Sequence, residues 1–249
     1  MALTGSSIEQ SALAAFRMII DFDPALRSIL WRSLGVSGSA TALAGALGLG
    51  LGAWIAVARF RGRGALLTLL NTSLALPSVV VGLVVYLLLS RSGPLGFLGW
   101  LYSFKAMVFA QTVLVLPVVT ALTRQAVEDA ERSHGEQLRS LGAGPWMRGL
   151  LLAADERYAL LTVLIASFGR AVSEVGAVMI VGGNIDGFTR VMTTAIALET
   201  SKGDLALALG LGALLLAVVL ALNLLIALLA RWRESRDGAA AEVARVLPA

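Results

Sequence analysis

The chain has 249 residues, of which 57% are hydrophobic and only 14% are charged, whereas soluble globular domains are about 45–50% apolar and about 25% charged. This composition indicates a protein of the lipid bilayer. The absence of cysteine excludes disulfides, thiolate nucleophiles and cysteine-ligated metals, and the single histidine, His134, cannot form a multi-histidine metal site. The net charge of +4 fits membrane topology better than nucleic-acid binding, because the arginines flank apolar runs.

The N-terminal residues 1–33 are predicted to form an external segment. Apolar and charged side chains are mixed over residues 14–32, which is typical of a helix that lies in the membrane interface. The sequence Asp21-Phe-Asp-Pro24 is expected to divide this interfacial helix, because proline favours a helix start.

A transmembrane domain is predicted over residues 34–230. Crossing about 30 Å of hydrocarbon as a helix takes roughly 20 apolar residues, and backbone groups in lipid must be satisfied within the segment, so long apolar runs predict helices and not barrel strands. The fold class is therefore all-α, with Pro77 and Pro117 expected to kink or loosen their helices. The five predicted spans are 34–58, 66–90, 104–123, 159–181 and 205–230.

Arginine and lysine side chains in the connections predict the orientation, because they are retained on the cytoplasmic side. If the first span runs inward, twelve of these residues lie on the cytoplasmic side and seven lie outside. The count predicts an external N-terminus and a cytoplasmic tail over residues 231–249. The alanine-rich part of this tail, from Gly238 onward, is expected to be disordered.

A cytoplasmic loop is predicted over residues 124–158, longer than a helical hairpin needs. It should form helix, turn and helix, because Gly142-Ala-Gly144 supplies a stop and Pro145 suits the first turn of a new helix. Its apolar side chains either tuck against the ends of the spans or pack on another chain. These residues are Leu138, Leu141 and Trp146.

Two ionisable residues, Arg170 and Glu174, fall within the fourth span, four positions apart and therefore on one helical face. A charge near the bilayer centre costs at least about 2.5 kcal/mol on insertion scales, so both should face protein or water. Either they form a self-neutralising pair that joins the bundle, or they line a constriction where Arg170 meets a passing anion. Ser173, beside them, is a structural hydrogen-bond donor or part of the same path.

A glycine-rich external loop is predicted over residues 182–190, followed by a short external helix over 191–201. Asn184, Thr189 and Arg190 offer an amide, a hydroxyl and a guanidinium to an oxyanion, and the planar guanidinium suits such a group. The alternative is that Arg190 extends along the interface and the glycines only turn the chain.

The cytoplasmic loop carries a resemblance to a known family. Glu136-Gln-Leu, with Gly142 six residues after Glu136, resembles the loop motif of type I ABC importer permeases, Glu-Ala-Ala, three residues and Gly. Gln137-Leu138 replaces the two alanines, and Leu152-Ala-Ala-Asp155 stands where that motif ends in Ile-x-Leu-Pro.

Other segments are similar to the same family from about residue 28 to residue 233. The segments 75–82 and 111–117 resemble the proline-bearing helices of oxyanion permeases. The segments 169–184 and 189–204 are similar to tungstate-type permeases and, more loosely, to molybdate-type ones.

This resemblance implies a type I ABC importer permease fold in a bacterial or archaeal cytoplasmic (inner) membrane. The chain would not be an enzyme and would bind no cofactor itself. ATP and Mg would be used by a separate ABC ATPase subunit, in keeping with the absence of a G-x-x-x-x-G-K-[ST] motif. Further partners would be a periplasmic or extracellular oxyanion-binding protein, which docks on the external loop, and a second copy of the chain, because one five-helix chain encloses little space.

The resemblance also implies the cargo and the ATPase contact. The cargo would be tungstate, or alternatively molybdate or another anion, moved by alternating access; a proton-coupled transporter or channel working through Glu174 is the competing class. Glu136 would give the ATPase a polar contact, and Gly142 would form the turn without a Cβ clash. The residues that would pack on the ATPase are Leu138, Leu141, Ala143 and Trp146.

Overall fold

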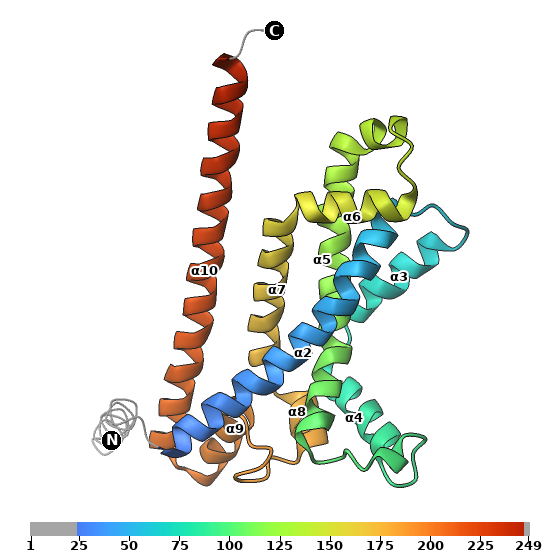
Figure 1. Ribbon diagram of the computed structural model, residues 1–249. Coiled ribbons are helices and arrows are strands. Elements are labelled where there is room, and N and C mark those ends of the chain that lie inside the picture. Colours follow the sequence, from blue (N-terminus) through green and yellow to red (C-terminus); the bar gives the residue numbers. More distant parts are fainter. Residues whose placement is uncertain (1–23, 247–249) are drawn as a thin grey trace.

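The structure, a computed structural model, describes the backbone of residues 24–246 and, apart from residue 25, the side chains up to residue 231. The regular structure of this part is helical (Figure 1). The helices are α2 (Pro24–Val57), α3 (Arg63–Leu74), α4 (Ser78–Leu89), the 3-10 turn η1 (Gly96–Leu98), α5 (Phe104–Ser140), α6 (Pro145–Asp155), α7 (Arg157–Val172), α8 (Gly176–Gly182), α9 (Met192–Lys202) and α10 (Leu205–Val246).

Three of the described helices, α2, α5 and α10, are long and apolar enough to cross a membrane by themselves. The pairs α3–α4 and α7–α8 reach the same criterion only together, and they are bent by 102° and 59°. The all-α fold with up to five crossings therefore agrees with the prediction, but two of the crossings are broken helices.

The first helix is longer than predicted. It runs without interruption from Pro24 to Val57, so residues 24–32 belong to it and do not form a separate interfacial helix. The reason is burial, because Leu26 and Ile29 of this stretch pack against the residues around Met192 of α9. The rest of the predicted external segment, residues 1–23, lies outside the described residues.

The second predicted span is two helices and not one continuous helix. The helix α3 ends at Leu74, α4 begins at Ser78, and Pro77 between them has extended dihedral angles (φ −62°, ψ 127°). Proline lacks an amide hydrogen and disfavours a helical residue before it, so a break here has a local cause. Pro117, by contrast, lies inside α5 without ending it.

The fourth predicted span is also interrupted, at residues 173–175. The backbone freed by this break finds partners elsewhere. The Glu174 carboxylate accepts the amide hydrogen of Ala177 (3.2 Å), and the Thr193 hydroxyl donates to the carbonyl of Glu174 (2.7 Å). These contacts give hydrogen-bond partners to backbone groups at the break, which would cost free energy if they were left unpaired away from water.

The C-terminal helix differs from its prediction in length. It continues through the alanine-rich segment that was expected to be disordered from Gly238, and it ends at Val246. Alanine has the highest intrinsic helix propensity, which explains why the helix continues.

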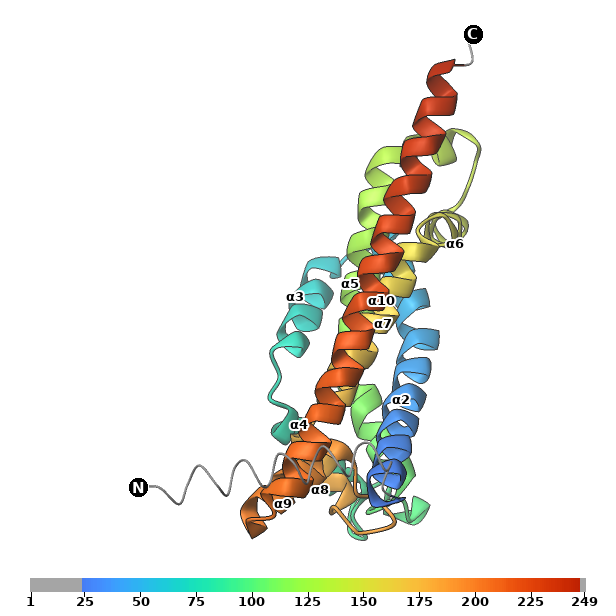
Figure 2. The same ribbon diagram turned by 90° about the vertical axis from the view of Figure 1, so that its left-hand side faces the viewer.

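The bundle has two distinct ends, which the two perpendicular views agree on (Figures 1 and 2). The α6 end carries α6, the end of α5, the connection between α2 and α3, and the C-terminus. The α9 end carries α8, α9, the start of α2 and the connection between α4 and α5. The predicted loop 124–158 and the predicted tail therefore share one end, as the predicted topology requires.

The core is built mainly where α2 runs along α5. Glycines allow this close approach, because a Cβ atom at Gly48 would lie 2.9 Å from the Val119 side chain, and one at Gly52 would lie 2.6 Å from the Thr120 carbonyl oxygen. Buried small and β-branched residues, among them Ala44, fill the rest of this contact.

Candidate functional site

The turn after α5 is fixed by backbone hydrogen bonds. The amide of Gly142 donates to the carbonyl of Arg139 (2.9 Å) and the amide of Ala143 donates to that of Leu138 (3.1 Å), which is a Schellman motif. Gly142 has φ 79°, a conformation that strains any residue with a Cβ atom. A Cβ atom there would meet nothing within 4 Å. The expected Cβ clash is therefore absent, and glycine is needed for its dihedral angles.

The helix α6 starts as predicted, with Gly144 as N-cap and Pro145 in the first turn. One face lies on α2, where a Cβ atom at Gly149 would come within 3.1 Å of the Ala53 carbonyl oxygen. The opposite face is apolar and exposed, with Trp146 58% accessible. We call this surface the α6 apolar face; it consists of Trp146, Met147, Leu150 and Leu151.

The predicted ATPase-contact residues divide into two groups. Leu141 is 77% exposed and Trp146 is also exposed, so both are free to meet another chain. Leu138 is half-buried and packs against the apolar cluster that α2, α5 and α6 form, so its packing lies largely within this chain. Glu136 is exposed and Ala143 is half-buried.

An ion network that the sequence did not reveal joins α5 to α6. Glu131 lies 2.6 Å from Arg139 and 3.4 Å from Nε of Arg148, and Arg148 also donates to the carbonyl of Ala143 (3.2 Å). The last turns of α5 are tilted relative to the rest of the helix at this end (Figure 1). Gly135 makes space for the Glu131 carboxylate, because a Cβ atom on Gly135 would lie 2.6 Å from Glu131 Cδ. The eight-residue separation of Glu131 and Arg139 is not a usual helical pairing, so spacing gave no signal.

The two broken helix pairs meet at their breaks. A Cβ atom at Gly176, the first residue of α8, would lie 2.8 Å from Ser78 Oγ at the start of α4. A Cβ atom at Gly82 would lie 2.7 Å from the Cα atom of Ala177. The two interruptions are therefore side by side, and α4 and α8 are in near backbone contact. Discontinuous helices of this kind form the ion and substrate sites of many transporters.

Arg170 and Glu174 do not form the pair that their spacing predicts. The break takes Glu174 out of α7, and its carboxylate accepts the amide hydrogen of Ala177. Within the described part of the chain no ion pair joins it to Arg170, whose side chain is exposed. Ser173 is exposed as well, and its hydroxyl donates to the carbonyl of Gly169 (3.0 Å). Of the two interpretations, the self-neutralising pair is therefore wrong.

The side chains of the glycine-rich loop that were predicted to bind an oxyanion form hydrogen bonds that stabilise the loop itself. Thr189 is fully buried; its hydroxyl donates to the carbonyl of Gly182 (2.5 Å) and accepts the amide hydrogen of Ile185 (2.9 Å). Asn184 has a positive φ of 49° and donates to the carbonyl of Thr194 (3.2 Å). These groups are engaged in the fold in this conformation.

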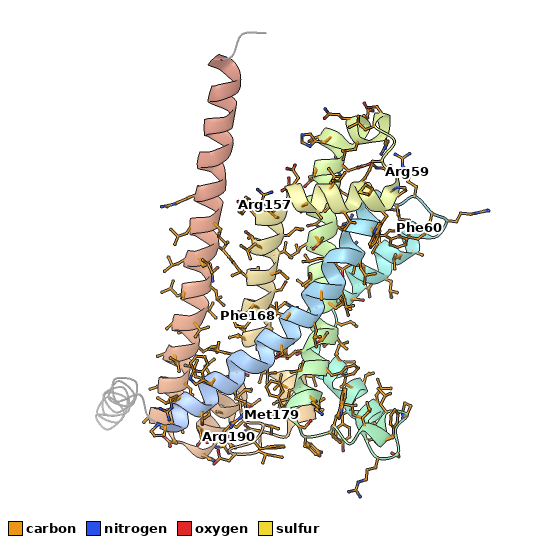
Figure 3. All side chains as sticks on the ribbon, in the orientation of Figure 1. Arg59, Phe60, Arg157, Phe168, Met179 and Arg190 are labelled. Carbon is orange, nitrogen blue, oxygen red and sulfur yellow. The ribbon has the colours of Figure 1, made fainter. Side chains whose placement is uncertain are left out.

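Arg190 lies at the α9 end of the molecule (Figure 3). Its guanidinium is 3.2 Å from the Asp186 carboxylate and 3.8 Å from that of the nearly buried Glu199. Arg32 of α2, which the sequence analysis did not single out, donates to the carbonyl of Gly187 (2.8 Å) and so ties the loop to the first helix. Arg190 is thus part of an ion cluster and does not simply extend along an interface.

The predicted site residues thus fall into three places. The ATPase-contact residues are at the α6 end, Arg170, Ser173 and Glu174 are at the helix break, and Asn184, Thr189 and Arg190 are at the α9 end. Among the described residues, no group of three histidine, cysteine or acidic side chains is arranged to hold a metal ion.

Comparison with known proteins identifies the family. Residues 48–236 match the binding-protein-dependent transport system inner membrane component family. The chain is 43% identical over 218 residues to a probable anion ABC transporter permease protein of Haloferax volcanii, covering 86% of this chain and 93% of that protein. It is 40% identical over 219 residues to the tungstate uptake system permease protein TupB of Peptoclostridium acidaminophilum, covering 88% and 96%.

A more distant relative is the molybdenum transport system permease protein ModB of Escherichia coli K12, 30% identical over 203 residues, covering 75% of this chain and 85% of that protein. The family match spans both broken helix pairs, the turn at Gly142 and α6. The chain therefore belongs to the binding-protein-dependent transport system inner membrane component family and is the permease subunit of an ABC transporter, whose ATPase is a separate chain.

Proposed function

We propose that this permease moves a tetrahedral oxyanion into the cytoplasm by alternating access, with tungstate as its cargo and molybdate or another anion as the alternative. The single observation that carries the anion path is Arg170, a cation exposed beside the two meeting helix breaks. A charged side chain inside a membrane span faces a water-filled path or a partner.

The ends of the broken helices support the same path. The helix α4 begins at its break and runs toward the α9 end, so its N-terminal backbone amides lie at the break (Figure 1). A helix N-terminus carries a partial positive charge, which together with Arg170 favours an anion at this level. Contacts of this kind are weak enough to let the anion pass on.

Arg170 and Ser173 would face a second copy of the chain across the path. A homodimer gives the exposed face of α7 a polar environment without placing arginine in lipid. The small residues near Arg170, Gly169 and Ala171 among them, allow two such helices to approach closely.

The α6 apolar face and Leu141 would dock on the ATPase subunit, which uses ATP and Mg. Their exposure as a group of large apolar side chains at the α6 end supports this role. The α6 end would then be cytoplasmic, with the C-terminus, and the α9 end external, where the loop around Asn184 and Arg190 would receive the solute-binding protein. Residues 34–230 would form the transmembrane domain between them.

A proton-coupled mechanism through Glu174 has less support. Its carboxylate accepts the amide hydrogen of Ala177 at the start of α8, so in this conformation the group has a structural task.

Uptake into vesicles tests the proposal. The permease is reconstituted with its ATPase and binding protein, and labelled tungstate, molybdate and sulfate are supplied outside. We expect ATP-dependent tungstate uptake that unlabelled molybdate competes with and sulfate affects less. Uptake driven by a pH gradient without ATP would contradict the proposal.

A further inference from the structure

A polar cavity of about 340 Å³ lies at the α6 end, between the last turn of α2, the start of α3 and the outer part of α5. It is separate from the α6 apolar face and from the helix breaks. Figure 3 shows Arg59, one of its lining residues, at this end. The charged residues that line it are Arg59, Arg63, Arg132, Arg139, Glu128 and Glu131.

The two glutamates do not neutralise the four arginines. Each glutamate is shared between one arginine that lines the cavity and one that does not, and the second carboxylate oxygen of Glu131 is buried. The cavity therefore keeps an excess of positive charge. The pairs are Glu128 with Arg63 and with Arg124 (2.6 Å), and Glu131 with Arg139 (2.6 Å) and with Arg148 (3.4 Å).

Two of the lining arginines are available to a ligand. Arg59 is exposed and has no ion-pair partner among the described residues. Arg132 has a side chain 76% exposed, and its one ion-pair partner among the described residues is Asp129, which is 72% exposed. A surface ion pair of this kind is weak and is readily exchanged for a better partner.

The chemistry of these groups selects a tetrahedral oxyanion. A guanidinium presents several N–H donors in one plane and can bind two oxygens of a phosphate at once. Arg139 donates to Glu131, and Arg63 donates to Glu128 and to the Ile55 carbonyl, so each guanidinium keeps further N–H donors. Four guanidinium groups with donors to offer therefore line the same cavity.

The position of the cavity favours a membrane interface. The rings of Trp54 and Phe60, which flank the lining residues 56–59 in the sequence, are stacked with their centroids 5.2 Å apart, and both side chains are partly exposed. Aromatic side chains gather at the level of lipid headgroups, and basic pockets between membrane helices bind anionic headgroups.

We propose that this cavity binds a phosphate-like oxyanion, supplied either by the headgroup of an anionic lipid or by a free anion from the aqueous phase. An occupant would compete with Glu131 for Arg139 and so act on the ion network that holds the turn to α6. The site does not depend on which anion the permease transports.

Ligand binding to the full-length chain in detergent tests this site. The cavity variant is Arg59→Gln/Arg132→Gln. The matched control variant is Arg157→Gln/Arg231→Gln, which removes two arginines of α7 and α10 that lie outside the cavity. Native mass spectrometry counts retained phosphatidylglycerol against phosphatidylcholine, and equilibrium dialysis measures labelled inorganic phosphate. Thermal unfolding without lipid checks that both variants keep the fold, as expected because Arg59 and Arg132 are exposed.

We expect the cavity variant to bind at least one of the two anionic probes about tenfold more weakly or worse, since each lost donor was a hydrogen bond to a charged group. A loss confined to phosphatidylglycerol identifies a lipid site, and a loss confined to phosphate identifies a free-anion site. Equal binding of both probes by the cavity variant and the control variant would overturn the proposal.

Discussion

At the scale of single residues, Gly142 is where the turn before α6 depends on one dihedral angle. Replacing it with valine forces a β-branched residue to φ 79°, at a cost of about 1–3 kcal/mol for a strained backbone position. We expect the chain to stay folded, because the position is exposed, but we expect the Schellman turn and the packing of α6 on α2 to be lost. Binding-protein-stimulated ATPase activity and uptake should both fall by more than about tenfold.

Gly144 provides the control for this prediction. It is equally open, with nothing within 4 Å of an added Cβ atom, but its φ is −67°. The Gly144→Val variant should therefore retain most of its stimulated ATPase activity. Equal activity of the two variants would show that the left-handed conformation at residue 142 is not needed.

Arg170 is predicted to meet the anion in the translocation path. Arg170→Gln should lower tungstate uptake by about tenfold or more, the value of a hydrogen bond to a charged group, and Arg170→Lys should recover part of it by keeping the charge. Ser173→Ala should transport normally, because among the described residues that hydroxyl is engaged with the carbonyl of Gly169 in the last turn of α7. Unchanged uptake by Arg170→Gln would remove this residue from the path.

Residue-level prediction succeeded where chemistry is local. The stop at Gly142 and the start at Pro145 follow from backbone preferences that any sequence reveals. The Arg170–Glu174 pair failed because the four-residue rule assumes a continuous helix. Here the helix is interrupted at residues 173–175, where residues of α4 and α9 contact the chain. Glu131 and Arg148 were missed because they meet only when α6 folds back on α5.

At the scale of elements, the contact between α4 and α8 depends on two glycines. At Gly82, a Cβ atom would lie 2.7 Å from the backbone of Ala177, which cannot move as a flexible side chain can. Overpacking of this kind costs about 1–3 kcal/mol, so Gly82→Ala should lower the unfolding temperature in detergent. Gly50→Ala, at a helical position with nothing within 4 Å, should leave it unchanged or slightly raised. Two equal melting curves would contradict the tight α4–α8 contact.

The elements themselves were predictable to different degrees. The short helix expected at 191–201 is α9, Met192–Lys202, because its boundaries are set by local signals. Proline gave an ambiguous signal: Pro77 accompanies a break, whereas Pro117 lies within α5. The break at Pro77 is completed by packing of α4 on α8, which no local pattern contains.

At the scale of the whole molecule, the apolar runs and the basic connections predicted an all-helical membrane protein with its charged loop and C-terminus at one end, and the two ends agree with this (Figure 2). The N-terminal part of α2 was misjudged because Leu26 and Ile29 lie among charged residues in the sequence and find apolar partners only in the folded chain. Amphipathic sequence alone does not distinguish a membrane interface from a protein core.

The central claim is that the separate ATPase subunit binds to the α6 end. Because the chain has no cysteine, Leu141→Cys places one thiol on the exposed turn, and Ile185→Cys places one at the opposite, α9 end. Site-specific crosslinking in membranes that contain the assembled transporter measures what each thiol meets. The account predicts that Leu141→Cys crosslinks to the ATPase subunit and Ile185→Cys does not. Labelling of Leu141→Cys by a membrane-impermeant reagent from outside, without any ATPase crosslink, would contradict it.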